Sequence, residues 1–225
     1  MNRVDFVAGE LAAVADEANA TAMAAYMKTD MPFFGVKRPY RDPIFKEMMR
    51  RFPVATRPEY ESGVRELWAQ PHREEKYLAV GLARAVPKYV TAPSLPLYRM
   101  LITDGAWWDF VDEVAAHLVG RLLLDDRHRI APVMEQWIDH PDMWLRRSAL
   151  LAHLRHKAAT DEAVLYDHCL RLAHEKEFFI RKAIGWVLRE YAKTAPESVT
   201  TFVVANRDRW SGLTFREASK HLSLE

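Results

Sequence analysis

A spacing of 35 residues recurs along the chain and limits its fold more than any other feature of the sequence. Steps of this length from Arg146 and from its neighbour Arg147 give two adjacent series of positions. Small residues, Ala149 and Ser219, lie two positions after members of the second series. The first series is Arg41, Lys76, Val111, Arg146, Arg181 and Arg216, and the second is Asp42, Tyr77, Asp112, Arg147, Lys182 and Glu217. Two-helix units with a period of roughly 30–45 residues are typical of an α-solenoid.

Apolar residues recur at helical spacing along almost the whole chain, with prolines and polar residues between the helical stretches. The predicted helices span residues 4–28, 40–52, 61–70, 72–89, 97–102, 107–124, 130–139, 143–157, 161–174, 178–191, 196–206 and 214–222. No stretch combines two-residue alternation with hairpin turns, so no sheet is expected. We therefore predict an all-α protein, an α-solenoid of about six antiparallel helix pairs with a concave basic groove. An irregular helical bundle is the alternative.

Composition excludes several classes of protein. The chain has 225 residues, of which 49% are hydrophobic and 28% charged, as in a globular protein that can bury a sizeable core. The single Cys169 excludes a disulfide framework and a cysteine-based zinc cluster. Charged residues near the N-terminus argue against a signal peptide, so a soluble, cytoplasmic protein is expected. The net charge of +1 neither supports nor excludes a nucleic-acid partner.

Trp108 and Asp112 are four residues apart in the helix expected over residues 107–124. Residues at this spacing share a helix face, and a core face usually carries aliphatic side chains instead of an indole beside a carboxylate. The alternative is a half-buried tryptophan beside an unrelated surface aspartate. Asp104 is expected to cap the helix at its N-terminus, whereas Asp109 lies about 100° away from Trp108 around the helix axis.

The repeat brings two more side chains to this face. Arg147 follows Asp112 by one repeat, and Trp186 lies one turn after Lys182, the next member of the same series. Two indoles can hold a cation or a flat ring by their π faces. The carboxylate adds a negative charge, and the arginine has a planar fork that suits a phosphate. The pattern therefore predicts a site for a ligand with a positive centre beside an anionic group.

Basic residues recur in successive repeats, at the expected edges of the groove. The candidate phosphate-binding residues are Lys37, Arg38, Arg41, Arg146, Arg181, Lys182 and Arg216. Tyr26 can also reach the groove, although a tyrosine at this place is almost as typical of a core. A single basic cluster with acids such as Glu47 nearby is typical of a solvated surface. Recurrence in successive repeats favours a groove that follows a phosphate backbone.

The sequence resembles the DNA alkylation repair glycosylases built from HEAT-like repeats, the AlkD type. The motifs that carry the resemblance follow one another along almost the whole chain, and the last of them is long and specific. They are Ala25-Tyr26-Met27-Lys28, Met31-Pro32-Phe33-Phe34-Gly35-Val36-Lys37, Leu67-Trp68-Ala69-Gln70-Pro71, Trp107-Trp108-Asp109-Phe110-Val111-Asp112, Trp144-Leu145-Arg146-Arg147, and the run of residues 177–193 that contains Arg181, Lys182 and Trp186.

This resemblance implies an active site and an activity. In that family the tryptophan and aspartate four residues apart, the arginine of the next repeat and the tryptophan of the repeat after it form the active site. The matching residues here are Trp108, Asp112, Arg147 and Trp186. Relatives that have lost activity lack parts of this set. The resemblance therefore implies an active enzyme that excises cationic N3- or N7-alkylated purines from DNA without a base-flipping pocket.

The expected chemistry uses few groups. A cationic purine is already a good leaving group, so one carboxylate suffices where many glycosyl hydrolyses need two. Trp108 and Trp186 are expected to stabilise positive charge on the deoxyribose. Asp112 adds electrostatic stabilisation and orients a water, and Arg147 is expected to hold a phosphate. Lys182 lies in the right series for a Schiff base, but the family analogy favours water as the nucleophile, so no lyase step is expected.

The expected assembly is simple. Residues 1–225 are predicted to form a single HEAT-like-repeat DNA glycosylase domain. The protein is expected to act as a monomer on double-stranded DNA that contains alkylated bases, without a cofactor, a metal or a membrane. The alternative is a non-catalytic helical-repeat protein that binds damaged or branched DNA, or a protein partner, through the same face.

Overall fold

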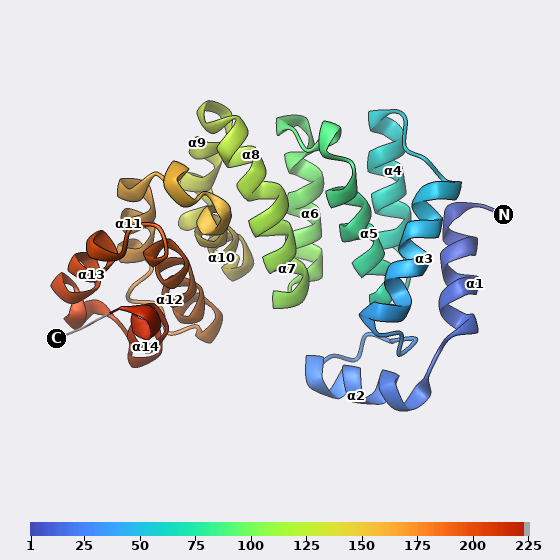
Figure 1. Cartoon of the computed structure of the whole chain (residues 1–225), viewed down its shortest axis with the longest axis horizontal. Helices are drawn as coiled ribbons and strands as arrows, with labels where there is room; N and C mark the ends of the chain where they lie inside the picture. The colour runs from blue at the N-terminus through green and yellow to red at the C-terminus, as the bar shows by residue number, and fades with distance from the viewer. Residues whose placement is uncertain (223–225) are drawn as a thin grey trace. The chain divides into compact units, whose positions relative to one another are not determined.

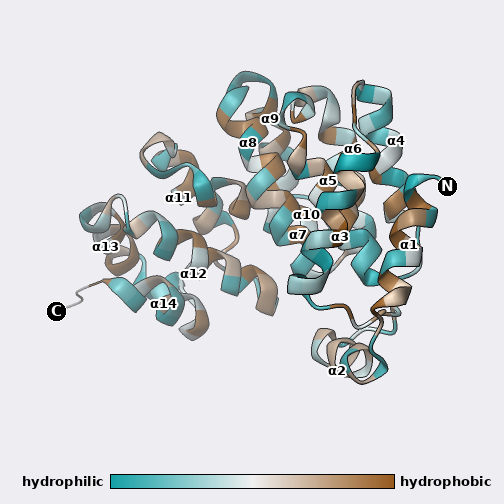
Figure 2. Ribbon diagram, turned by 45° about the vertical axis from the view of Figure 1, so that its right-hand side comes forward, coloured by the Kyte–Doolittle hydropathy of each residue, from teal (hydrophilic) through white to brown (hydrophobic). Residues whose placement is uncertain are grey.

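The chain divides into two compact units, Met1–Val90 and Thr91–Glu225, and the computed structural model describes residues 1–222. All regular structure among the described residues is helical, and no strand occurs there, which confirms the predicted all-α repeat class. Most helices carry both hydrophobic and hydrophilic residues around their axes (Figure 2), as expected for helices that bury one face. Within residues 1–222, no helix is long and apolar enough to cross a bilayer.

The first unit contains five α-helices (Figure 1). They are α1 (Arg3–Ala13), α2 (Glu17–Met27), α3 (Arg38–Arg51), α4 (Arg57–Trp68) and α5 (Arg73–Ala85), followed by the 3-10 turn η1 (Pro87–Tyr89). Helices α4 and α5 form the most extensive pair, and α1 packs on α3 and α4. Buried Phe6, Met48, Tyr60 and Leu82 lie in this core, where the Tyr60 hydroxyl donates to the Ala83 carbonyl at 2.9 Å.

The single helix predicted over residues 4–28 is wrong, because the structure has two helices there. The chain leaves α1 at Val14, and Asp16 then caps α2 through a hydrogen bond from the Asn19 backbone N–H at 2.8 Å. The backbone N–H of Asp16 donates to the Phe34 carbonyl at 2.9 Å instead of continuing α1. An aspartate side chain that hydrogen-bonds nearby backbone groups favours a helix end over a helix interior. The hydrogen bond to Phe34 then holds the chain in the break between α1 and α2.

The second unit contains the remaining helices (Figure 1). The α-helices are α6 (Leu95–Gly105), α7 (Trp108–Val114), α8 (Gly120–Asp125), α9 (Arg127–Ile138), α10 (Met143–Leu151), α11 (Glu162–Arg171), α12 (Phe178–Ala192), α13 (Pro196–Ala205) and α14 (Gly212–Ala218). Shorter segments are η2 (Ala92–Ser94), η3 (Ala115–Val119), η4 (Ala152–Arg155), η5 (Lys157–Ala159), η6 (Arg207–Arg209) and η7 (Ser219–His221).

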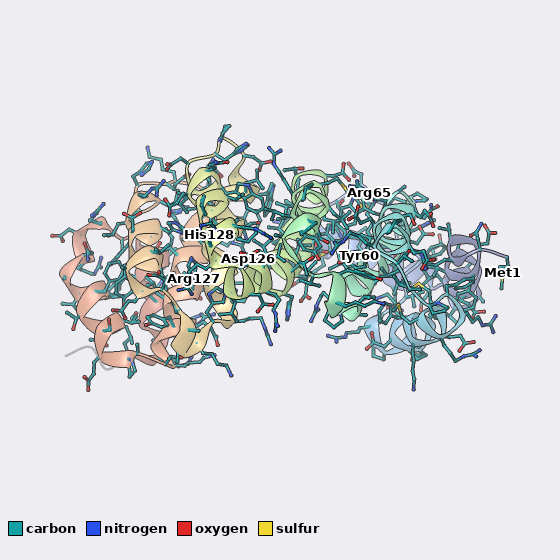
Figure 3. All side chains as sticks on the ribbon, turned by 90° about the horizontal axis from the view of Figure 1, so that it is seen from above. Met1, Tyr60, Arg65, Asp126, Arg127 and His128 are labelled. Atoms are coloured by element: carbon teal, nitrogen blue, oxygen red, sulfur yellow. The ribbon has the colours of Figure 1, made fainter. Side chains whose placement is uncertain are left out.

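The 35-residue repeat has a direct structural meaning in this unit. Helix α10 packs against α7 on one side and α12 on the other, and α12 packs against α14. Other contacts between repeats use similar but not identical spacings: Arg127, at the start of α9 (Figure 3), pairs with Asp161, 34 residues on, at 3.6 Å and donates to the Ala159 carbonyl at 2.8 Å. Each repeat therefore binds the next one through equivalent positions.

The predicted N-cap at Asp104 is wrong. Helix α6 continues through Gly105, so Asp104 lies in its last turn, and Trp107 occupies the N-cap position of α7. The reason is a tight turn at Ala106, which has a left-handed backbone conformation with φ of 38° and donates its N–H to the Ile102 carbonyl at 3.0 Å. A turn this short leaves no room for a side-chain cap between the two helices.

The helix expected over residues 107–124 changes its hydrogen-bond pattern midway. A π-helical segment, η3, separates α7 from α8 and begins three residues after Asp112. Close packing explains the glycine at its end, because a Cβ on Gly120 would lie 2.4 Å from the Ala152 carbonyl oxygen. The Gly120 carbonyl accepts a hydrogen bond from Nε2 of His156 at 2.8 Å. Segments of this kind are frequent at functional sites.

Candidate active site

Asp112 and Arg147 form a bidentate ion pair between α7 and α10. The Nε of Arg147 lies 2.7 Å from Oδ1 of Asp112, and Nη2 lies 2.8 Å from Oδ2. The Arg147 side chain is 3% exposed and the Asp112 side chain is 14% exposed, so water screens the pair weakly. A parallel, charge-assisted pair of this geometry fixes both planar groups relative to each other.

The remaining guanidinium nitrogen of Arg147 is also bound. Nη1 donates to the backbone carbonyl of Phe179, at the start of α12, and the guanidinium lies 5.7 Å from the centroid of the Phe179 ring. Arg147 thus joins three successive repeats through α7, α10 and α12. This arrangement differs from the expectation that Arg147 would present its fork to a phosphate, because Asp112 already occupies the fork.

Three aromatic rings pack together on these same repeats. The Trp107 ring lies 6.1 Å from that of Trp144 and 5.5 Å from that of Phe179, and Trp144 lies 5.0 Å from Phe179. Asp142 caps α10 by accepting from the Trp144 backbone N–H at 2.7 Å. Phe179 was not among the residues predicted for the site, although it follows Trp144 by one 35-residue repeat.

Burial and pairing act in opposite directions on Asp112. Burial raises the pKa of Asp112 above its ordinary value of 3.8, and the hydrogen bonds and charge of Arg147 lower it again. Asp109 and Glu113 add small contributions that raise it. Arg147 is therefore the group that opposes protonation of a desolvated carboxylate. Loss of this arginine would leave Asp112 buried among acidic neighbours.

The two predicted tryptophans lie on the flanking helices. Trp108 is the first residue of α7, one turn before Asp112, and Trp186 is in the middle of α12. Both indoles are partly exposed, in contrast to buried Trp144. Because α10 packs against both α7 and α12, the four predicted catalytic residues belong to three adjacent helices of one unit. Their roles in catalysis stay a prediction.

A second charged cluster continues the same series on α12 and α14. The Glu217 carboxylate lies 2.7 Å from Nζ of Lys182 and 2.7 Å from Nζ of Lys220, and it also binds Arg189. Although burial alone would raise the pKa of Glu217, these cations lower it to about 2. Gly185 allows the close approach of the two helices, since a Cβ there would lie 2.4 Å from the Glu217 Cβ.

The predicted DNA-binding residues differ in how available their charges are. In the first unit, Lys37 is exposed, Arg38 forms an exposed pair with Asp42 at 3.4 Å, and Arg41 lies 4.5 Å from the Tyr77 ring centroid. Burial lowers the pKa of Arg41. Tyr26 is 74% exposed.

In the second unit, Arg216 is exposed and Arg181 is half-buried. Arg146 is 14% exposed, pairs with Glu175 at 2.7 Å and donates to the His140 and Pro141 carbonyls. Lys182 is held by Glu217. Lys37, Arg38 and Arg216 are therefore the exposed cations of the predicted set, and Arg38 is the one that pairs with a carboxylate.

A family model and a solved structure that are similar to this chain carry the same description. The sequence matches the family model described as DNA alkylation repair enzyme over residues 7–222. A solved structure described as a predicted DNA alkylation repair enzyme from Enterococcus faecalis is similar over 94% of this chain and 98% of its own, with 26% sequence identity and a TM-score of 0.86. No curated protein matches the sequence.

Two further solved structures, both from Streptococcus mutans, share the fold at 14% identity. AlkD2 is similar over 91% of this chain and 100% of its own, with a TM-score of 0.63. The protein smu.31, from strain UA159, is similar over 82% of this chain and 98% of its own, with a TM-score of 0.59. These two likenesses concern the architecture alone.

Proposed function

Because this chain belongs to the family of DNA alkylation repair enzymes, we propose that it is a monofunctional DNA glycosylase. Its substrate would be duplex DNA with cationic N3- or N7-alkylated purines, and its reaction the hydrolysis of the N-glycosidic bond by water. The observation that carries the proposal is the buried ion pair of Asp112 and Arg147, on the face of α7 that also carries Trp108.

The carboxylate has a defined task in this reaction. As the bond to a cationic purine breaks, the base leaves neutral and positive charge develops on the deoxyribose. An ionised Asp112 stabilises that charge and orients a water toward the anomeric carbon. Because the site is poorly hydrated, the interaction is stronger than it would be in bulk water. The partly exposed indoles of Trp108 and Trp186 add their π faces.

Arg147 takes a role different from the one expected from the sequence. With all three guanidinium nitrogens bound to Asp112 and to the Phe179 carbonyl, it acts as a positioning residue that keeps Asp112 ionised and oriented. Accessible cations such as Lys37 and Arg216 would contact the DNA phosphates in place of Arg147. The proposal retains a single-domain monomer that acts in the cytoplasm on double-stranded DNA, without a cofactor.

Lys182 also bears on the reaction type. A Schiff base requires a free amine that can attack the sugar, whereas Nζ of Lys182 contacts the Glu217 carboxylate at 2.7 Å. Water is therefore the proposed nucleophile, and no strand cleavage should accompany base release.

The test is base release from duplex DNA that contains N7-methylguanine, with free base and strand cleavage measured in the same reaction. Stoichiometric release of free base with intact strands is the expected result. Binding of the duplex without release above the uncatalysed rate would favour the alternative, a non-catalytic helical-repeat protein that binds DNA. Strand cleavage that accompanies release would overturn the water mechanism.

A further inference from the structure

Three aromatic rings join the first turns of the helices that carry the proposed active site. Trp107 occupies the N-cap position of α7, and Trp144 and Phe179 are the second residues of α10 and α12. The three ring centroids lie 5.0, 5.5 and 6.1 Å apart, a separation at which aromatic pairs attract each other. In this aromatic cluster of Trp107, Trp144 and Phe179, the starts of three inner helices meet.

Each of these helices carries one ring of the aromatic cluster and a predicted catalytic residue after it. On α7 the ring directly precedes Trp108. On α10 it precedes Arg147 by three residues, and on α12 it precedes Trp186 by seven. Close-packed side chains resist displacement. The packing of the rings therefore limits how far the predicted catalytic residues can move relative to one another.

Phe179 connects the aromatic cluster to the buried ion pair. Its backbone carbonyl accepts a hydrogen bond from Nη1 of Arg147, and its ring centroid lies 5.7 Å from the guanidinium carbon. A cation within roughly 6 Å of a ring centroid is attracted to the ring, and more strongly where water is scarce. The Arg147 side chain is only 3% exposed. Its guanidinium is thus held by Asp112 and by Phe179 together.

The charge of Asp112 depends on how well Arg147 is placed. Burial raises the pKa of Asp112, Arg147 lowers it, and the neighbouring carboxylates of Asp109 and Glu113 raise it. Glu113 in turn lies 3.8 Å from Nε2 of His117. Of the charged groups that act on Asp112 directly, Arg147 is the one that favours the ionised carboxylate. A displaced guanidinium would therefore favour the protonated form.

We propose that Phe179 is a positioning residue of the proposed reaction: supported by Trp107 and Trp144, its ring holds the Arg147 guanidinium against Asp112 and keeps the carboxylate ionised. This inference rests on the proposed function, which gives the ionised Asp112 its task in base release. Ordinary packing between repeats is the alternative, and it would leave the charge of Asp112 independent of the Phe179 ring.

The ionisation of Asp112 can be measured without DNA. The full-length protein, labelled with ¹³C at the aspartate carboxylates, would be titrated by NMR, with the Asp112 signal assigned from its loss in Asp112→Asn. Phe179→Leu keeps the backbone carbonyl and a branched apolar side chain but removes the ring. In this variant the pKa of Asp112 should rise by about half a unit to one unit, as expected for the loss of one cation–ring contact.

Phe202→Leu is the matched control. Phe202 and Phe179 are both partly buried in the second unit, and both pack against other rings. The Phe202 ring lies 3.8 Å from that of Tyr166 and 5.6 Å from that of Trp210. Loss of either phenyl ring should lower stability, but only Phe179→Leu should move the titration of Asp112. Phe179→Tyr, which keeps a ring at this place, should retain the wild-type pKa.

A double variant tests whether the effect passes through Arg147. In the Arg147→Met background the guanidinium is absent, so Phe179→Leu should not raise the pKa of Asp112 any further. Activity should follow the titration. On the acid limb, single-turnover release of N7-methylguanine by Phe179→Leu should be about three- to ten-fold slower than in the wild type, whereas the rate at alkaline pH should be kept.

The wild type provides a measurement that depends on no variant. A guanidinium that is bound through three nitrogens rotates slowly, so the Nη protons of Arg147 should give separate NMR signals. These signals, assigned through the Arg147 backbone, should also show nuclear Overhauser contacts with the Phe179 ring. One averaged Nη signal without such contacts would contradict the positioning role.

Three results with the variants would also overturn the proposal: an unchanged Asp112 titration in Phe179→Leu, the same shift in Phe202→Leu, or a further shift in the Arg147→Met background. Base release by the wild type reports separately on the proposed glycosylase. An unchanged titration together with normal release would refute this inference alone. A shifted titration in a protein that releases no base would refute the proposed reaction alone.

Discussion

Replacement of Arg147 by methionine separates the two roles available to this arginine. The substitution keeps an apolar stem of similar length and removes the guanidinium. If Arg147 positions Asp112, the variant leaves a buried carboxylate without its partner. Removal of one member of a buried ion pair costs about 3–5 kcal/mol of unfolding free energy, and the low exposure of both side chains favours a loss in that range. Arg38→Met, which breaks an exposed pair with Asp42, should change stability little.

The pH dependence of excision carries the sharper information. The active form requires ionised Asp112, so the rate falls as pH decreases through the pKa of this residue. That pKa is raised by burial and opposed by Arg147, so Arg147→Met must raise it further. The acid limb of the profile should therefore move to higher pH, with partial recovery of the rate in alkaline buffer.

The assay is the single-turnover release of N7-methylguanine across the pH range in which both variants stay folded, after subtraction of uncatalysed release. Denaturant unfolding at each pH defines that range, and DNA affinity is measured against salt in parallel. An acid limb at the wild-type position, with the whole profile merely lower, would refute the positioning role. A salt slope reduced by about 0.9, as for one lost phosphate contact, would restore the phosphate role expected from the sequence.

Three further predictions concern binding and stability. Lys37→Ala and Arg216→Ala should each reduce the slope of log affinity against log salt by about 0.9; unchanged slopes for both would remove them from the DNA interface. Gly185→Ala should lower the free energy of unfolding by about 1–3 kcal/mol, because its Cβ would meet the Glu217 Cβ and the Thr214 carbonyl oxygen. Thermal melts measure this loss. The control is Gly9→Ala, which has open space around it and should stabilise α1 slightly. Burial lowers the pKa of His153 well below 6.5, so as the pH falls the unfolded chain binds a proton before the folded one does. The contribution of this group to the free energy of unfolding should be complete above pH 6.5 and should decrease below it by at most about 1.4 kcal/mol per pH unit. His153→Phe should remove this decrease.

The repeat and half of the active site could be predicted from the sequence for one physical reason. Helix pairs of constant length place residues 35 apart on adjacent helices, so Asp112 and Arg147 had to be neighbours once the period was recognised. The same spacing joins Lys182 to Glu217 and Trp144 to Phe179. Periodicity reports which residues meet, because it reflects the geometry of stacked elements.

What the residues do on meeting could not be predicted in the same way. The fork of Arg147 suits a phosphate or a carboxylate equally well, and the choice of Asp112 depends on burial that the spacing does not encode. The break between α1 and α2 depends on a hydrogen bond from Asp16 to Phe34, which is a tertiary contact. The turn at Ala106 uses a left-handed conformation at a residue that does not favour it, so Asp104 gave the wrong helix start.

The most direct test of the proposed mechanism is the rate of excision by Asp112→Asn. This change keeps the shape of the side chain, retains an acceptor for Arg147 and removes the charge. Single-turnover release of N7-methylguanine should slow by about two to four orders of magnitude, while affinity for an uncleavable duplex should hold or improve slightly. Asp109→Asn, on another face of α7, should release the base at close to the wild-type rate. Excision by Asp112→Asn at the wild-type rate, or parallel loss of binding and excision, would contradict the assignment of Asp112 as the catalytic carboxylate.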